Sequence, residues 1–128
     1  MWTYSLSNWE LSDGKRIVHA YSGRRGPYQN NPFYCSAIMR GPIPLGEWTI
    51  GRAVEHTQLG PRAFPLVPCT GTETYGRSGF FIHGDSIEHP GDASDGCIVT
   101  CYPSGLADRQ YIADNLALPN GNKLEVIP

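Results

Sequence analysis

Glycine and proline recur along the whole of this chain, and their spacing limits its possible folds more than any other feature. The 128 residues include 15 glycines and 11 prolines, which favours short strands joined by many turns over a helical bundle and excludes a coiled coil. A chain of this length has room for one hydrophobic core. We therefore expect a single domain over residues 1–128.

The charge and hydropathy patterns point to neither a polyanion nor a membrane as partner. The chain has ten Lys and Arg residues and twelve Asp and Glu residues, and no basic run is longer than the Arg24–Arg25 pair. We therefore expect no nucleic-acid partner. No stretch of about 18 apolar residues occurs, so no membrane span is expected. The first residues lack the basic and apolar regions of a secretion signal, which predicts that no signal peptide is present.

Alternating and β-branched segments predict a mostly β fold. Residues 2–6 and 16–21 are expected to form an opening β-hairpin, and the aperiodic segment 22–39 is expected to be a loop. Further strands are predicted over residues 47–50, 64–68, 79–83, 97–101 and 123–127.

Prolines and capping residues predict an edge strand and a helix. The segment 64–68 is predicted to be an edge strand, because each of its prolines removes a hydrogen-bond donor from the sheet. One amphipathic helix is expected near the C-terminus, capped by Ser104 and ending before Pro119. A turn at Asn120–Gly121 then leads into the last strand.

The four cysteines do not follow a zinc-binding pattern. Three residues separate Cys97 from Cys101, and Cys35 and Cys69 stand far from both, so neither a CxxC pair nor a zinc-ribbon spacing is present. The even count permits a disulfide such as Cys35–Cys69, although sequence does not assign connectivity. We expect Cys101 to be a packed thiol.

A cysteine and a histidine carry the sharpest chemical signal. Cys97 follows His83 by fourteen residues, and both stand at the ends of predicted core strands. An imidazole within hydrogen-bond reach can accept the thiol proton and stabilise the thiolate, which is the reactive nucleophile. Gly96 permits backbone conformations that other residues avoid, so the N–H groups of Gly96 and Cys97 are expected to bind an oxyanion.

The sequence leaves open two other interpretations of these residues. Cys97 can be a small buried cysteine after a turn, with His83 bonded to a backbone carbonyl. His83, Asp85 and His89 are residue types that ligate zinc, but their spacing follows no familiar zinc motif. We therefore predict neither a metal nor another cofactor.

The segments around Cys97 and His83 resemble a known family. Residues 81–85 read FIHGD and residues 93–99 read ASDGCIV, and together they resemble the active-site block of the YkuD-type L,D-transpeptidases, in which IHG is followed by S-x-G-C. Residues 44–50, PLGEWTI, resemble the P-x-G-x-(F/Y)-x-I segment of that family. A compact branch among the antibacterial effectors of type VI secretion is similar over most of the chain, notably at 2–4, 31–32, 41–44 and 76–85.

The resemblance implies a fold and a set of site residues. The fold would be a compact L,D-transpeptidase-type β-sandwich or barrel with one short C-terminal helix. Cys97 matches the nucleophile and His83 the base. The residues expected to support the site are Ser94, Asp95, Gly84 and Asp85.

Two positions depart from the pattern of the better-known members. Asp95 stands where they often have His or Lys, and Val99 stands where they have an Arg or Asn that helps to hold the substrate. Arg77 and Asp85, which flank the strand that carries His83, are candidate replacements. The residues that we predict to contact substrate are Arg77, Trp48 and His89. The alternatives are a solvated turn residue for Arg77 and an exposed loop residue for His89.

The reaction implied by the resemblance acts on peptidoglycan tetrapeptide stems, L-Ala-D-Glu-meso-diaminopimelate-D-Ala. Cys97 would attack the carbonyl at the L-centre of diaminopimelate and release D-alanine, leaving a thioester. Water as acceptor gives L,D-carboxypeptidase action, a free D-amino acid gives exchange, and a diaminopimelate amine gives a 3-3 cross-link.

The resemblance to the effector branch also implies a location and partners. The protein would be a monomer that a type VI apparatus delivers from the producer to the periplasm of a target cell, and a cognate immunity protein would block its site. Two alternatives remain from the sequence: a non-catalytic module that binds peptidoglycan or a secretion component, and a cysteine endopeptidase that cuts cross-bridges.

Overall fold

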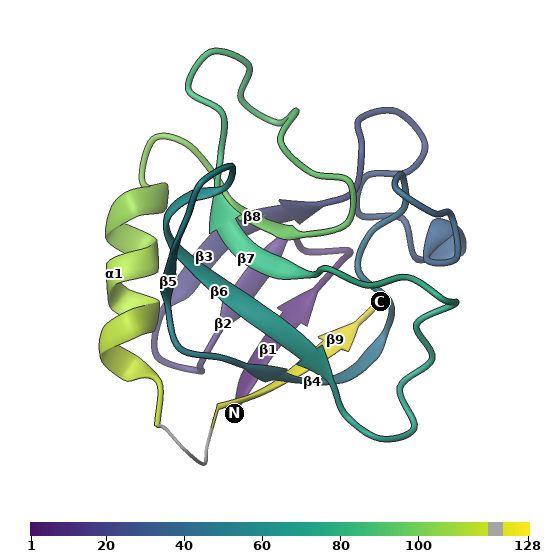
Figure 1. The fold of residues 1–128 in the computed structure, drawn as a ribbon, viewed down its shortest axis with the longest axis horizontal. Helices are drawn as coiled ribbons and strands as arrows, with labels where there is room; N and C mark the ends of the chain where they lie inside the picture. Colours follow the sequence, from purple (N-terminus) through teal and green to yellow (C-terminus); the bar gives the residue numbers. More distant parts are fainter. Residues whose placement is uncertain (118–121) are drawn as a thin grey trace.

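Nine short strands form one sheet in the computed structural model, which describes residues 1–117 and 122–128 (Figure 1). In chain order the elements are β1 (Trp2–Ser5), β2 (Glu10–Ser12), β3 (Ile17–Ser22), the 3₁₀ turn η1 (Pro32–Tyr34), β4 (Gly46–Ile50), β5 (Val54–His56), β6 (Gly60–Pro68), β7 (Phe81–Gly84), β8 (Ile98–Thr100), the helix α1 (Gly105–Asn115) and β9 (Lys123–Ile127).

The sheet closes on itself. The strands pair in the order β4-β9-β1-β2-β3-β8-β7-β6-β5, and β4 also pairs with β6, which completes a barrel. The β1–β9 and β7–β8 pairs are parallel, and the others are antiparallel. Helix α1 packs against β6, β7 and β8 on one side of the barrel (Figure 1). The prediction of a mostly β barrel with a short C-terminal helix is confirmed.

The predicted opening hairpin is wrong, because a third strand lies between its two arms. β2 pairs antiparallel with both β1 and β3. Leu11 of β2 stands opposite Tyr4 on one side and Val18 on the other, and all three side chains are fully buried. A strand of three residues is too short to show the alternation that identifies longer strands.

The edge strand predicted at residues 64–68 is also wrong, because β6 pairs with β7 on one side and with β4 and β5 on the other. Proline removes a donor but keeps its carbonyl acceptor. The Pro65 carbonyl accepts the Gly51 N–H at 2.8 Å, while the neighbouring Leu66 N–H donates to Phe80 at 2.9 Å. Other residues therefore supply the N–H groups that the prolines lack.

The helix forms close to where it is predicted, but its cap and its buried face differ. The Ser104 hydroxyl lies 2.9 Å from an Asp108 carboxylate oxygen and makes no bond to the helix backbone. Leu106 is 59% exposed, whereas Asp108, Arg109 and Ile112 are buried. The inward face is therefore partly polar, because Arg109 lies against the end of the sheet. The predicted turn at Asn120–Gly121 lies outside the described residues.

Among residues 1–117 and 122–128, no helix combines the length and the apolar character that crossing a membrane requires.

The buried position of Leu11 gives a test of the fold. We expect Leu11→Ala to lower the free energy of unfolding by about 2–5 kcal/mol, because it leaves a cavity among Tyr4, Val18 and their neighbours. The control Leu106→Ala should change it by no more than about 0.5 kcal/mol, because that side chain is largely exposed. Urea denaturation followed by tryptophan fluorescence measures both values, and equal losses would contradict this placement of β2.

Candidate active site

The parallel pair β7 and β8 brings the predicted cysteine and histidine to one cavity. Ile82 of β7 pairs with Ile98 of β8, and both are fully buried in the barrel core. Because side chains alternate along a strand, the neighbours His83 and Cys97 belong to the opposite face. Both line a cavity of about 520 Å³, so residues fourteen positions apart face the same space.

The walls of this cavity come from four separate segments of the chain: 38–39, 56–59, 76–83 and 93–97. No sequence motif marks the segments 38–39 and 56–59, so their residues Met39 and Leu59 are not predicted to line the site. His56, which belongs to none of the motifs in the sequence, also lines the cavity and packs edge-on against Phe81, with 5.3 Å between the ring centroids.

His83 is oriented as a proton acceptor. Its side chain is buried, and Nδ1 lies 2.8 Å from the Gly84 carbonyl oxygen. A carbonyl oxygen only accepts hydrogen bonds, so Nδ1 carries the hydrogen and Nε2 keeps its lone pair. Burial lowers the pKa of His83 below its usual 6.5, the bond to Gly84 opposes this, and the positive charge of Arg109 lowers the pKa further. The imidazole is therefore neutral at neutral pH.

The surroundings of Cys97 favour the protonated thiol over the thiolate. Burial raises its pKa above 9, the Phe81 N–H lowers it, the negative charge of Asp95 raises it and the positive charge of Arg77 lowers it. Its Sγ lies 3.8 Å from the Gly79 carbonyl oxygen, with the thiol as donor. The hydrogen bond that the sequence leads us to expect between Cys97 and His83 is not among those of the described residues, so the resting state does not favour the expected thiolate.

Ser94 organises the turn before Cys97. Its buried Oγ accepts N–H groups from Gly23 at 2.9 Å and Gly96 at 3.1 Å, and it donates to the Cys97 carbonyl at 2.6 Å. Gly96 has φ of +146°, and a Cβ at this position would lie 2.5 Å from Nη2 of Arg77. The serine and glycine of the S-x-G-C segment therefore hold the backbone that carries the cysteine.

Only one of the two N–H groups that are predicted to bind the oxyanion is free to do so. The Gly96 N–H is already bonded to Ser94 Oγ, and Gly96 is buried. It therefore does not point at a substrate carbonyl, and the expectation for Gly96 is wrong. Of the two groups, the Cys97 N–H remains the candidate.

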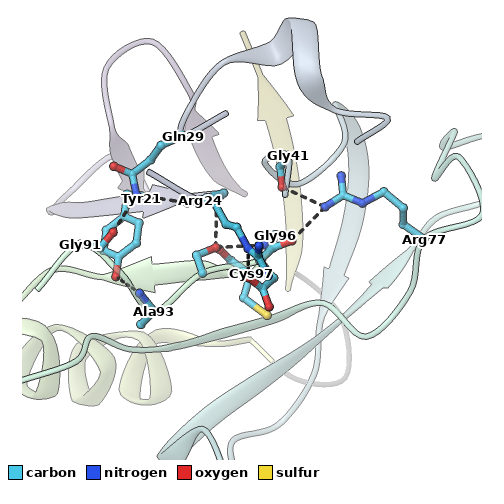
Figure 2. Close-up of polar contacts among 12 residues, drawn as sticks. Tyr21, Arg24, Gln29, Gly41, Arg77, Gly91, Ala93, Gly96 and Cys97 are labelled. Carbon is cyan, nitrogen blue, oxygen red and sulfur yellow. Dashed lines mark hydrogen bonds and ion pairs between the residues drawn. The ribbon is translucent and has the colours of Figure 1, made fainter. Parts of the chain in front are cut away.

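Arg77 is a buried clamp and not a solvated turn residue, and it also lines the cavity that holds Cys97 and His83. Its guanidinium lies 5.1 Å from the centroid of the Phe80 ring. It donates to four backbone carbonyls, those of Cys35 (2.5 Å), Pro42 (2.8 Å), Gly41 (2.9 Å) and Asp95 (3.2 Å). Figure 2 shows Arg77 on one side of Cys97, with Tyr21 and Gln29 on the other. Its side chain joins the 35–42 loop to the turn that carries Cys97.

The two aspartates also hold loops. Asp85 accepts hydrogen bonds from the Tyr21 hydroxyl (2.5 Å) and from the N–H groups of Ser86 (2.8 Å), Gly91 (3.1 Å) and Tyr102 (3.2 Å). It thereby closes the 84–96 loop onto the barrel. Asp95 is exposed and forms an ion pair with Arg24 at 2.8 Å. Neither carboxylate is free to hold a substrate group in place of the missing Arg or Asn.

Of the predicted substrate contacts, Trp48 is wrong, and His89 has the exposed loop position that is the alternative for it. Trp48 is fully buried in the barrel core, where its Nε1–H donates to the Pro44 carbonyl at 3.1 Å and its ring packs edge-on against Phe80. His89 is exposed in the 84–96 loop and does not line the cavity with Cys97. Trp48 was indicated by its position in a motif, which does not report which way a side chain faces.

All four cysteines lie within the described residues, and all four are free thiols. Cys35 is buried and its Sγ lies 3.6 Å from the Ile43 carbonyl oxygen, while Cys69 lies 3.3 Å from Lys123 Nζ. The permitted Cys35–Cys69 disulfide is therefore not formed. Burial raises the pKa of the Cys101 thiol to about 11, with further contributions from Asp85 and Asp108.

The part of the chain that the structure describes contains no cluster of three or more His, Cys, Asp or Glu side chains able to hold a metal ion. His83, Asp85 and His89 do not converge on one point.

The chain is similar to known proteins in both sequence and fold. A family model described as the Tlde1 domain matches residues 16–118. No curated protein matches the chain in sequence. Among solved structures, an L,D-transpeptidase from Xylanimonas cellulosilytica is similar with a TM-score of 0.55 and 21% sequence identity, covering 98% of this chain. This chain spans 58% of the length of that one, and the likeness establishes the fold.

The contacts of Arg77 predict a structural effect when it is replaced. We expect Arg77→Gln to lower the free energy of unfolding by about 2–4 kcal/mol, because hydrogen bonds to charged groups contribute about 1.5–3 kcal/mol each and are not additive. The control Arg24→Gln removes an exposed ion pair and should leave stability unchanged. Chemical denaturation measures the free energy of unfolding of both variants. An Arg77→Gln protein of unchanged stability would contradict the structural role of Arg77.

Proposed function

This chain belongs to the Tlde1 domain family, and from that premise we propose that it is a peptidoglycan-modifying cysteine enzyme that acts on tetrapeptide stems. The observation that carries the proposal is the shared cavity of Cys97 and His83, with the lone pair of His83 Nε2 left free. The L,D-transpeptidase fold supports the same class of substrate. Val99 in place of a polar residue leaves the recognition of the stem to other groups.

The proposed reaction starts from a neutral thiol and a neutral imidazole. Cys97 Sγ attacks the carbonyl at the L-centre of diaminopimelate while His83 Nε2 takes the thiol proton. The tetrahedral oxyanion is stabilised by the Cys97 N–H. His83 then passes the proton to the amine of D-alanine, the carbon–nitrogen bond breaks, and a thioester remains on Cys97.

The second half of the reaction depends on the acceptor. His83 Nε2 takes a proton from water, from a free D-amino acid or from a diaminopimelate amine as that group attacks the thioester. The collapse of the intermediate expels the sulfur, which recovers a proton from His83. Water gives L,D-carboxypeptidase action, and amines give exchange or a 3-3 cross-link.

The arrangement favours general-base catalysis over a resting thiolate–imidazolium pair. Burial disfavours both charged forms, because it raises the pKa of Cys97 and lowers that of His83. The bonds of Ser94 and the clamp of Arg77 fix the backbone on which the sulfur approaches the substrate. Preorganisation of this kind lowers the cost of reaching the attacking geometry.

We also propose that the protein is an antibacterial effector of type VI secretion. It would act as a monomer in the target-cell periplasm, where trimming or exchange removes the tetrapeptides that serve as cross-linking donors, and a cognate immunity protein would protect the producer. Membership in the Tlde1 domain family supports this role. The rival candidate is a non-catalytic peptidoglycan-binding module, which is favoured by the lack of a Cys97–His83 hydrogen bond in the described structure.

Analysis of muropeptides tests the reaction. The wild-type protein should convert tetrapeptide muropeptides to tripeptides, or to exchanged forms when a D-amino acid is added, and mass spectrometry measures both products. Cys97→Ala should lower the rate at least about a thousandfold, because it removes the nucleophile. Cys69→Ser, at a thiol outside the cavity, should keep full activity.

Two outcomes would contradict the proposal in different ways. If the wild type leaves tetrapeptides intact, the enzyme proposal fails and the binding module replaces it. If cross-bridges are cut to give free side-chain ends without loss of D-alanine, the protein is an endopeptidase.

The lowered pKa of His83 predicts the pH dependence. The base must be neutral to accept a proton. The rate of D-alanine release should therefore be constant around pH 7 and fall only below pH 6.5, where the imidazole becomes protonated. Initial rates between pH 4.5 and 8 measure this fall in rate on the acidic side, and tryptophan fluorescence checks that the protein stays folded. An acidic limb centred above pH 6.5 would instead indicate an imidazolium stabilised by a thiolate.

A further inference from the structure

His56 lines the active-site cavity but takes no part in the proposed proton transfers. It ends β5, is half-buried, and shares the cavity of about 520 Å³ with Cys97 and His83. Its Nδ1 accepts the backbone N–H groups of Gln58 and Leu59, both at 3.1 Å. Nδ1 therefore keeps its lone pair, and the hydrogen of the neutral ring is on Nε2.

The ring of His56 is held in place and presents an N–H group. The two nitrogens of an imidazole point in nearly opposite directions, so Nε2 faces away from the turn at 57–59 that Nδ1 contacts. Nε2 makes no hydrogen bond to any residue that the structure describes. Edge-on packing against Phe81 restrains the ring further. A donor that is already fixed loses little conformational entropy when an acceptor binds to it.

The other polar side chains that line the cavity, apart from the proposed base, are committed or exposed. Arg77 donates to four backbone carbonyls, and the carboxylate of Asp95 is held in an ion pair. Gln58 and Ser78 are exposed, so their side chains are less restrained. His56 is therefore the polar group of this cavity that is both fixed and available to a substrate.

His56 and Cys97 lie on opposite sides of Phe81. Because Ile82 of β7 pairs with Ile98 of β8, Phe81 stands next to Cys97. β5 lies on the other side of β7, beyond β6. One strand spacing of about 4.8 Å and the ring separation of 5.3 Å put the imidazole on the order of 10 Å from the sulfur. The Phe81 ring forms the floor between the sulfur and the imidazole.

This direction differs from that of the leaving group. In the proposed reaction His83 gives its proton to the leaving amine, so D-alanine lies toward His83, two residues along β7 from Phe81. The path across Phe81 is therefore open to the side chain of the residue whose carbonyl is attacked.

The side chain of meso-diaminopimelate matches this path in length and in chemistry. It has three methylene groups and ends at the D-centre, which carries an amine and a carboxylate. With carbon–carbon bonds of about 1.5 Å, it extends about 8 Å from the attacked carbonyl to that carboxylate. A hydrogen bond of about 3 Å completes the distance to the imidazole. The methylene groups suit the apolar floor, and the carboxylate suits an N–H donor.

We propose that His56 determines specificity for the stem peptide, its Nε2–H binding the carboxylate at the D-centre of meso-diaminopimelate. The identity of this ligand rests on the proposed function. A lysine at the same position of a stem has the same chain length and the same terminal amine, but it lacks this carboxylate. The cavity therefore prefers diaminopimelate stems to lysine stems.

The test measures binding to the full chain carrying Cys97→Ala, which prevents turnover. The probes are L-Ala-D-Glu-meso-diaminopimelate-D-Ala, the same peptide with its D-centre carboxylate amidated, and L-Ala-D-Glu-L-Lys-D-Ala, each titrated by NMR. We expect the first to bind about tenfold more tightly than the lysine stem, because only the first offers a charged acceptor to His56. It should bind about three- to tenfold more tightly than the amidated stem, whose acceptor is neutral.

An isosteric variant separates the N–H donor of His56 from its contacts with the turn. In His56→Asn the amide oxygen takes the place of Nδ1 and can still accept the N–H groups of Gln58 and Leu59, but no donor remains at the position of Nε2. We expect the preference for diaminopimelate over lysine to fall to about twofold or less. The control His19→Asn, at an exposed histidine outside the cavity, should leave the preference unchanged.

Several outcomes would overturn this inference. Equal affinity for the diaminopimelate and lysine stems, or for the acid and its amide, would do so without any change to His56. A preference that His56→Asn leaves intact would show that another group reads the carboxylate. If His56→Asn weakens both stems by the same factor, His56 only supports the turn.

The same peptides distinguish this inference from the proposed function. If the wild type releases D-alanine from both stems with equal kcat/KM, the function stands and the specificity of His56 fails. If the binding results are as expected but the wild type releases no D-alanine, the carboxylate contact stands and the enzymatic function fails. If neither stem binds, both fail.

Discussion

The parallel pairing of β7 with β8 is the constraint on which the site depends. It sets Ile82 opposite Ile98 in the core and leaves His83 and Cys97 to the outer face. A shift of this register by one residue would exchange the buried and outward positions of every side chain on the strand. Burial of the two isoleucines in the apolar core selects the register of β7 and β8. The core therefore determines that His83 and Cys97 lie on the same outer face.

The residues around Cys97 act mainly on the backbone. Ser94 and Arg77 bond to carbonyl and N–H groups of the turn, and Asp85 does the same for the loop that follows His83. A short S-x-G-C segment can carry this arrangement because serine supplies both donor and acceptor, and glycine supplies a φ that other residues avoid. The polar side chains around Cys97 are thus largely occupied by hydrogen bonds to the backbone.

The sequence predicts those parts of the molecule that local pattern or motif determines. Longer alternating or β-branched strands, the helix, and the shared cavity of Cys97 and His83 are of this kind, whereas the expected hydrogen bond between these two residues is not found among the described residues. The strand at Glu10–Ser12 is too short to show a period, and the pairing of β6 on both sides depends on strands that are distant in sequence. The burial of Trp48 and of Arg109 depends on which face of the barrel each side chain meets, which the spacing of residues in one sequence does not report.

The closure of the barrel also bears on how the molecule reaches its native state. β9 (Lys123–Ile127) pairs with both β1 (Trp2–Ser5) and β4, so the ring is completed by residues near opposite ends of the chain. Such distant contacts incur the loop-closure entropy before their bonds form, which slows folding. A polypeptide that ends before Lys123 would lack β9, so the barrel can close only once the whole of residues 2–127 is free to condense.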